Sequence, residues 1–184
     1  MSRARVLSPR MVAAVLTVIL ALGGVSADVA AASPGRHLAI PALGIHEPIY
    51  RWGCHGGTLP NHVYSWGCSG HNNLYLLGHA WGVFKPVHDA WATHSLTKGM
   101  TLRLRTATGK VLSFHLAWVR KVHAADLGTD MWGPGKTWAW NATPRRVVTL
   151  QTCWGRRSQD RIIVRFRLSA GSHRENGLST GHRL

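Results

Sequence analysis

The sequence predicts an all-β protein, most simply a β-barrel, because its apolar residues follow the two-residue period of strands and no repeat or helical bundle is visible. Residues 147–155 (VVTLQTCWG) are β-branched and apolar and end on a cysteine, and residues 161–168 (RIIVRFRL) follow after a short polar loop. Residues 111–122 alternate with Leu112, Phe114 and Leu116 on one face. Two strands joined by so short a loop are most simply an antiparallel pair, which puts the end of the first beside the start of the second.

The remaining chain divides into shorter elements. Residues 37–50 are extended but contain Pro41 and Pro48, which predicts an edge strand. The glycine-rich segment 52–70 predicts a hairpin with its tip near residues 59–61. The other expected elements are short strands at 74–77 and 100–105, one or two helical turns within 83–94, and a long loop with three tryptophans at 126–140.

The N-terminus has the pattern of an export segment. Arg3, Arg5 and Arg10 precede an apolar run at residues 11–24, and small residues suitable for cleavage follow at 25–27. Residues 1–33 are therefore expected to be either a signal peptide or an N-terminal membrane anchor. Residues 34–170 are then expected to form one β-barrel domain, and residues 171–184 a disordered polar tail.

The chain is strongly basic, with a net charge of +15 in 184 residues. Removing residues 1–27 removes three arginines and no acid, which leaves +12. Such a charge attracts polyanions, but export and the absence of a groove-reading motif argue against a nucleic-acid partner. The charge is then either a solvated surface or a nonspecific attraction to a negatively charged cell envelope.

Three cysteines in an exported chain predict one disulfide and one free thiol. Cys54 and Cys68 both follow a Trp-Gly pair, so they are the expected bridge, which would close a loop of about 15 residues and stabilise the fold by roughly 3 kcal/mol. A zinc site that uses these cysteines with His55, His62 or His71 is the competing interpretation. The spacing does not match structural zinc motifs, so no metal is expected.

The free thiol is then Cys153, at the tip of the strand at 147–155. The predicted antiparallel pairing places it beside Arg161, at about 5 Å between Cα atoms. A fixed cation favours a thiolate and can bind an oxyanion, so Cys153 is a candidate nucleophile. Arg165 and Arg167 share the period-2 face of Arg161 and are alternative candidates for its role.

These residues carry a resemblance to the sortases, the cysteine transpeptidases of the bacterial surface. Residues 149–153 (TLQTC) resemble the TLxTC signature of that family, and residues 77–79 (LGH) resemble its catalytic-histidine motif, with Arg161 in the place of its essential arginine. Residues 40–45 (IPALGI) are similar to the first strand of the family, and the resemblance extends in chain order over residues 38–168. It implies a closed sortase-type β-barrel with short helices and long loops.

The resemblance also implies the chemistry. Cys153 would attack the Thr–Gly bond of an LPxTG- or LAxTG-like sorting signal, His79 would transfer protons, and Arg161 would hold the oxyanion. Thr152 and Trp154 are the expected substrate-binding residues, and His123 is the alternative histidine. The acceptor would be an amine of a peptidoglycan precursor or a pilin lysine, no cofactor is needed, and the enzyme would act outside the cytoplasm, at the cell envelope.

Two other functions fit the same residues. A thiol peptidase would release the peptide to water and would use the same three side chains. A catalytically silent, basic wall-binding module on the same fold would not need them, and their presence argues against it.

Overall fold

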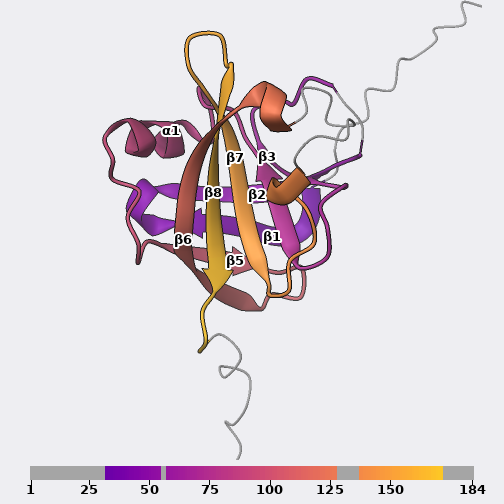
Figure 1. Ribbon diagram of the computed structural model, residues 1–184. Coiled ribbons are helices and arrows are strands. Elements are labelled where there is room, and N and C mark those ends of the chain that lie inside the picture. Colours follow the sequence, from indigo (N-terminus) through magenta and orange to yellow (C-terminus); the bar gives the residue numbers. More distant parts are fainter. Residues whose placement is uncertain (1–31, 55–56, 128–136, 172–184) are drawn as a thin grey trace, which may run out of the picture.

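The protein is a closed barrel of eight strands with one short helix on its side (Figure 1). The computed structural model describes residues 32–54, 57–127 and 137–171. Around the barrel the strands follow the order β1-β2-β3-β4-β7-β8-β6-β5. This architecture confirms the all-β class and the closed barrel. All but the first residue of the predicted polar tail, and all but the last two residues of the predicted export segment, lie outside the described residues. Among the described residues no helix is long and apolar enough to cross a membrane.

The first two strands correct the prediction of an edge. β1 (Ala32–Ile40) pairs with β2 (Ile45–Trp52) on one side and with β5 (Thr101–Arg105) on the other, so it has two neighbours. Pro41 begins a short 3₁₀ turn, η1 (Pro41–Leu43), instead of interrupting a strand. Pro48 lies one residue before the pairing of β2 with β3 begins, so its missing N–H costs that ladder nothing.

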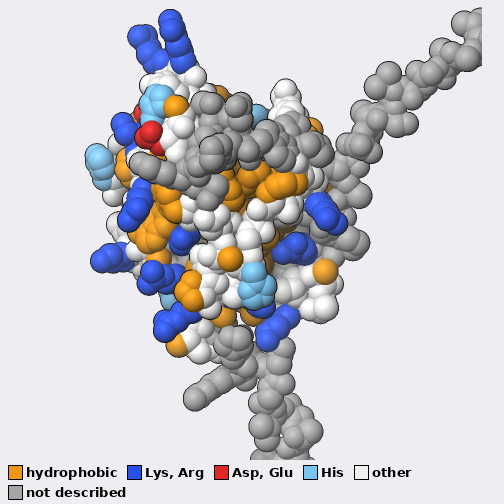
Figure 2. Space-filling model, turned by 45° about the vertical axis from the view of Figure 1, so that its right-hand side comes forward, with side chains coloured by type: hydrophobic (Ala, Val, Ile, Leu, Met, Phe, Trp, Pro, Cys, Tyr) orange, Lys and Arg blue, Asp and Glu red, His pale blue; other side chains and the backbone are white. Residues whose placement is uncertain are grey.

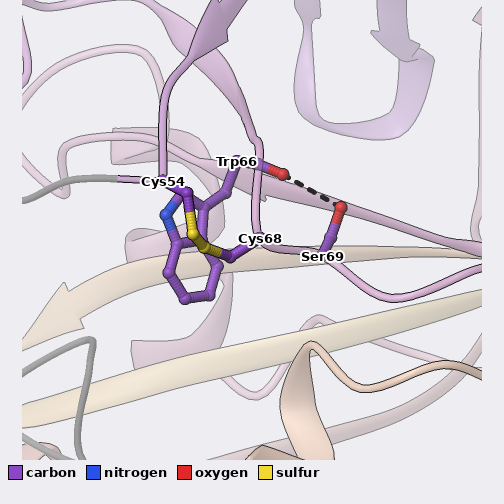
Figure 3. Close-up of a disulfide and its surroundings, with 4 residues drawn as sticks. All are labelled: Cys54, Trp66, Cys68 and Ser69. Carbon is purple, nitrogen blue, oxygen red and sulfur yellow. Dashed lines mark hydrogen bonds between the residues drawn. A yellow bond between two sulfur atoms is a disulfide. The ribbon is translucent and has the colours of Figure 1, made fainter.

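Segment 52–70 is not a hairpin. β3 (Val63–Trp66) pairs with β2 in parallel, and Trp52 is the partner of Trp66. The ten residues between the strands let the chain cross back and re-enter in the same direction, which a tight turn does not allow. The two Trp-Gly-Cys triplets are thereby in register, and Cys54 and Cys68 form the predicted disulfide with their Cα atoms 5.1 Å apart (Figure 3). Both sulfurs are thus bonded to each other and are not available as zinc ligands.

The other predicted strands and the helical turns are confirmed, whereas most of the loop predicted at 126–140 lies outside the described residues. β4 (Asn73–Leu77) is antiparallel to β3 and parallel to β7 (Val147–Trp154), which forms the expected antiparallel pair with β8 (Asp160–Leu168). β6 (Val111–His123) joins β8 to β5. The predicted helical turns are α1 (Lys85–Ala92).

The apolar residues form two clusters, one on each face of the sheet. The interior of the barrel holds the first, which includes Leu112, Phe114 and Leu116 on the face that the alternation predicted. The second lies on the outer face of β3, β4, β7 and β8 and contains Tyr75 and Trp140. Two 3₁₀ turns, η2 (Ala124–Leu127) and η3 (Thr137–Ala139), bring Leu127, Ala139 and Trp140 onto this outer face.

Arg165 ties the segment around η3 to the barrel. Its Nε donates to Thr149 Oγ1 at 3.1 Å, and its Nη2 donates to the carbonyls of Trp138 and Ala139 at 3.2 and 2.7 Å. The guanidinium also lies 4.8 Å from the centre of the Trp118 ring. Burial lowers the pKa of Arg165 from its ordinary value, but an arginine remains charged at neutral pH. Arg165 is therefore a structural cation.

We expect Arg165→Gln to lower the free energy of unfolding by about 2 kcal/mol, because a hydrogen bond to a charged group contributes about 1.5–3 kcal/mol and part of the set can be replaced by water. Urea unfolding followed by tryptophan fluorescence measures the change. Arg167→Gln is the matched control, since Arg167 lies on the same face of β8 and is exposed. Equal stability of the two variants would contradict the anchoring role.

Removing the disulfide with Cys54→Ala and Cys68→Ala together should lower stability by about 3 kcal/mol, given the 14-residue separation of the two cysteines. Thermal unfolding with and without a reductant checks this. The reductant should lower the melting temperature of the wild type and leave that of the double variant unchanged; a reductant effect on both would show that the disulfide is not the sensitive group.

Candidate active site

Cys153 and Arg161 face each other where β7 ends and β8 begins. They are direct partners in the antiparallel register, as the short loop between the strands predicted. Gly155 and Ser158 turn the chain with φ angles of 86° and 53°, in the left-handed region. Arg161 Nη1 donates to the carbonyls of Ser158 and Asp160, the latter at 2.9 Å, so this loop fixes the position of the guanidinium.

His79 reaches the same place through the neighbouring strand. β4 and β7 are parallel with Leu77 opposite Gln151, and Gly78 N donates to Gln151 O at 3.2 Å. His79 lies two residues beyond Leu77, as Cys153 lies two residues beyond Gln151. Equal steps along parallel strands keep residues level, so the register leads the histidine to the same end of the sheet as the cysteine.

The backbone also orients the His79 ring. Its Nε2 lies 2.6 Å from the carbonyl oxygen of Leu59, in the segment that joins β2 to β3. A carbonyl only accepts a hydrogen bond, so Nε2 is the donor and carries a hydrogen. In the neutral ring the lone pair is then on Nδ1, which is the nitrogen left for proton transfer.

The three side chains line one cavity of about 270 Å³ on the outer face of the sheet. The barrel supplies Tyr75, Leu77 and Gln151, and the loops supply Leu59 with the residues around η2 and η3. The complete lining is Leu59, Trp66, Tyr75, Leu77, Gly78, His79, Ala124, Leu127, Trp140, Gln151, Thr152, Cys153 and Arg161. The wall is mostly apolar, with the few polar groups gathered at the ends of the strands, which is typical of a ligand-binding site.

A buried hydrogen bond lies in the wall of this cavity. The Tyr75 hydroxyl donates to Gln151 Oε1 at 2.5 Å. Burial raises the pKa of Tyr75, while the charges of Arg161 and Arg165 oppose the shift, so the phenol remains neutral and acts as a donor. Gln151 is thereby held on the same side of β7 as Cys153.

The two predicted substrate-binding residues lie in different surroundings. Thr152 lines the cavity and is buried, and its Oγ1 has no hydrogen-bond partner among the described residues. Trp154 does not line the cavity; its ring packs 4.5 Å from the ring of His88 on α1 and 6.5 Å from that of Trp91. Substrate binding by either residue stays a prediction.

The alternative candidates have other surroundings. Arg165 is bound to the η3 segment, and Arg167 is exposed and pairs with Val147 at the opposite end of β7 from Cys153. His123 is exposed at the end of β6, where its Nδ1 accepts from Ala125 N. None of these three residues lines the cavity.

Sequence reasoning missed three residues of the site: Leu59, Tyr75 and Gln151. Gln151 could have been found, because it is two residues before Cys153 and therefore on the same face of the strand. Tyr75 could have followed from the parallel register of β4 and β7 had that register been known. No sequence signal indicated that the carbonyl of Leu59 would meet a histidine 20 residues away.

Solved structures with this fold come from several bacteria. Sortase A from Corynebacterium diphtheriae is 17% identical, with a TM-score of 0.57 over 76% of this chain and 62% of that chain. Sortase D5 from Clostridium perfringens is 19% identical, with a TM-score of 0.56 over 74% and 79% of the two chains. Sortase C-1 from Actinomyces oris is 21% identical, with a TM-score of 0.52 over 73% and 72%. At these identities the likeness shows the fold.

The protein family to which the chain belongs is shown by its sequence. No curated protein sequence matches the chain. A family model described as the sortase domain matches residues 38–169, which is most of the chain and contains every strand from β2 to β8. The chain therefore belongs to the sortase family.

Proposed function

We propose that the protein is a cysteine transpeptidase that cleaves an LPxTG- or LAxTG-like sorting signal at its Thr–Gly bond and joins the new carboxyl end to an amine. Membership of the sortase family supports a transpeptidase role in general. The observation that carries the proposal for this chain is that adjacent strands place His79, Cys153 and Arg161 on one cavity.

The first step forms a thioester. Cys153 Sγ, as the thiolate, attacks the threonine carbonyl carbon, and the carbonyl oxygen becomes an oxyanion. When the C–N bond to glycine breaks, the protonated His79 gives a proton to the leaving amine. The hydrogen bond from Nε2 to Leu59 O supports this assignment, because it fixes the ring with Nδ1 available.

The second step reverses the roles. An amine acceptor attacks the thioester carbonyl, neutral His79 accepts its proton, and Cys153 leaves as the thiolate. The acceptor we propose is a peptidoglycan-precursor amine or a pilin lysine at the cell envelope, with the export segment as the route to that compartment. If water attacks instead, the products are a free carboxylate and the free enzyme.

Arg161 is proposed to hold the oxyanion in both steps. Within the part of the chain that the structure describes, the hydrogen bonds of Arg161 all involve Nη1, so Nε and Nη2 make none. A guanidinium fixed by one nitrogen can direct its other N–H groups at a developing negative charge without reorganising.

The first test incubates the full chain with quenched LPxTG and LAxTG peptides, with and without triglycine, and detects products by mass spectrometry. We expect ligated product from the wild type and a loss of at least about 10³-fold in Cys153→Ala, because the nucleophile is removed. Cleavage that depends on Cys153 but ignores triglycine would contradict transpeptidation and indicate a hydrolase. Absence of any reaction across the panel would count against these sorting signals as substrates.

Arg161→Lys should lower kcat by about 10²-fold, because an ammonium keeps the charge but not the second set of donors. Arg167→Gln, on the same strand and face, should leave kcat within about twofold of the wild type, because it lies outside the cavity. Steady-state kinetics separates the two outcomes. If Arg161→Lys kept the kcat of the wild type, the paired N–H donors of the guanidinium would not be needed to stabilise the oxyanion.

A further inference from the structure

A second cavity, of about 710 Å³, lies at the end of the barrel away from Cys153. Arg146 lines it and directly precedes β7, whose far end holds Cys153, seven residues and about 23 Å away at the rise of a strand. Its floor is the apolar interior of the barrel, with Leu104, Leu112 and Phe114. This cavity shares Trp66 with the one that Cys153 lines, but its other lining residues differ and lie toward the opposite mouth of the barrel.

Three arginines occupy core-facing positions around this mouth. Arg36 is two residues before Leu38, Arg51 two residues after Ile49, and Arg146 two residues before Val148. Leu38, Ile49 and Val148 are fully buried in the barrel. The three arginines are thus two residues from core positions on three parts of the barrel, and all three line the cavity, Arg36 half-buried and the other two exposed.

No carboxylate neutralises these arginines within the part of the chain that the structure describes. The residues that line the cavity include no aspartate or glutamate, and His71 adds a further basic group. The acidic residues that form ion pairs in the described part of the chain are Asp89 and Asp160 only, and neither lines the cavity. Figure 2 shows the same imbalance on the face that it draws, where blue Lys and Arg side chains are spread widely and red ones are confined to one spot.

Arg36 shows that these charges are not all solvated surface. It is half-buried, and burial alone lowers its pKa, with no acid opposing the shift. An arginine remains charged, so its desolvation is a cost that a bound anion would offset.

We propose that this mouth, formed by Arg36, Arg51 and Arg146, binds a multiply charged phosphate ligand of the diphosphate class. Guanidinium groups match phosphate oxygens with paired N–H donors. Three of them around one cavity suit an anion with two or more charges, and the volume exceeds what one phosphate group fills. The apolar floor strengthens each contact by excluding water.

The test is calorimetric titration of the full chain with inorganic pyrophosphate at low and at physiological ionic strength. We expect saturable binding that weakens about tenfold or more in Arg51→Gln and in Arg146→Gln, because each substitution removes a charge-assisted contact. Both side chains are exposed, so folding should survive, and circular dichroism checks it. No saturable binding by the wild type would overturn the proposal.

Arg103→Gln is the matched control. It removes the same charge from an exposed arginine, but Arg103 alternates with the buried Leu102 and Leu104 and so lies outside the barrel. It should change the affinity no more than about twofold. If Arg103→Gln lost as much affinity as Arg51→Gln and Arg146→Gln, pyrophosphate would be attracted by the net charge of the protein, and the proposed site would be overturned.

A vesicle experiment identifies the source of the phosphate. The full chain and its variants are mixed with vesicles of phosphatidylcholine alone or with added phosphatidylglycerol. Lipid headgroups are the source if Arg51→Gln binds the anionic vesicles more weakly than the wild type and pyrophosphate displaces the wild type from them. Soluble diphosphates are the source if pyrophosphate binds the protein but the variants bind the vesicles as the wild type does. Binding should persist in Cys153→Ala, so the site and the proposed catalysis can fail independently.

Discussion

The parallel pairing of β4 with β7 is the constraint on which the site depends. It holds Leu77 opposite Gln151 and so levels His79 with Cys153, two residues that are 74 positions apart in the chain. The antiparallel pairing of β7 with β8 then adds Arg161 on the other side. These two hydrogen-bonded ladders of backbone are stiff, and they set the spacing of the three residues before any side chain contributes. Loops are left to orient those side chains and to complete the wall of the cavity.

The sequence predicted what is local and missed what requires distant partners. The β7–β8 pair, with Cys153 beside Arg161, followed from two apolar runs and a short loop between them. Residues 37–50 were assigned to an edge because proline cannot donate to a ladder, and this was wrong because Pro48 lies just before the pairing with β3 begins. The interpretation of 52–70 as a hairpin failed because a loop of that length permits either direction of return, and no local pattern chooses between them.

Segment 52–70 contains a sequence signal for the parallel pairing that the sequence analysis interpreted only in part. The repeated Trp-Gly-Cys triplets indicated a disulfide, but a repeat 14 residues apart also fits a parallel register, in which equivalent residues of each copy lie side by side. The positions of Leu59 and of Arg165 could not be predicted in this way. Each depends on which carbonyls a loop presents once the barrel has closed, and that is decided by packing against Trp138, Trp118 and their neighbours.

The barrel gives its two ends different chemistry through the same alternation of side chains. At the Cys153 end the reactive residues lie on the outer face, under loops that supply an apolar wall. At the Arg146 end it is the inward face that bears the charges, where the apolar core runs out and Arg36 is held half-buried above it. An inward arginine without a carboxylate destabilises an empty barrel, so its presence favours a function over stability. The same reasoning applies to the charge of Arg36, which is not part of a fully solvated surface because its side chain is half-buried.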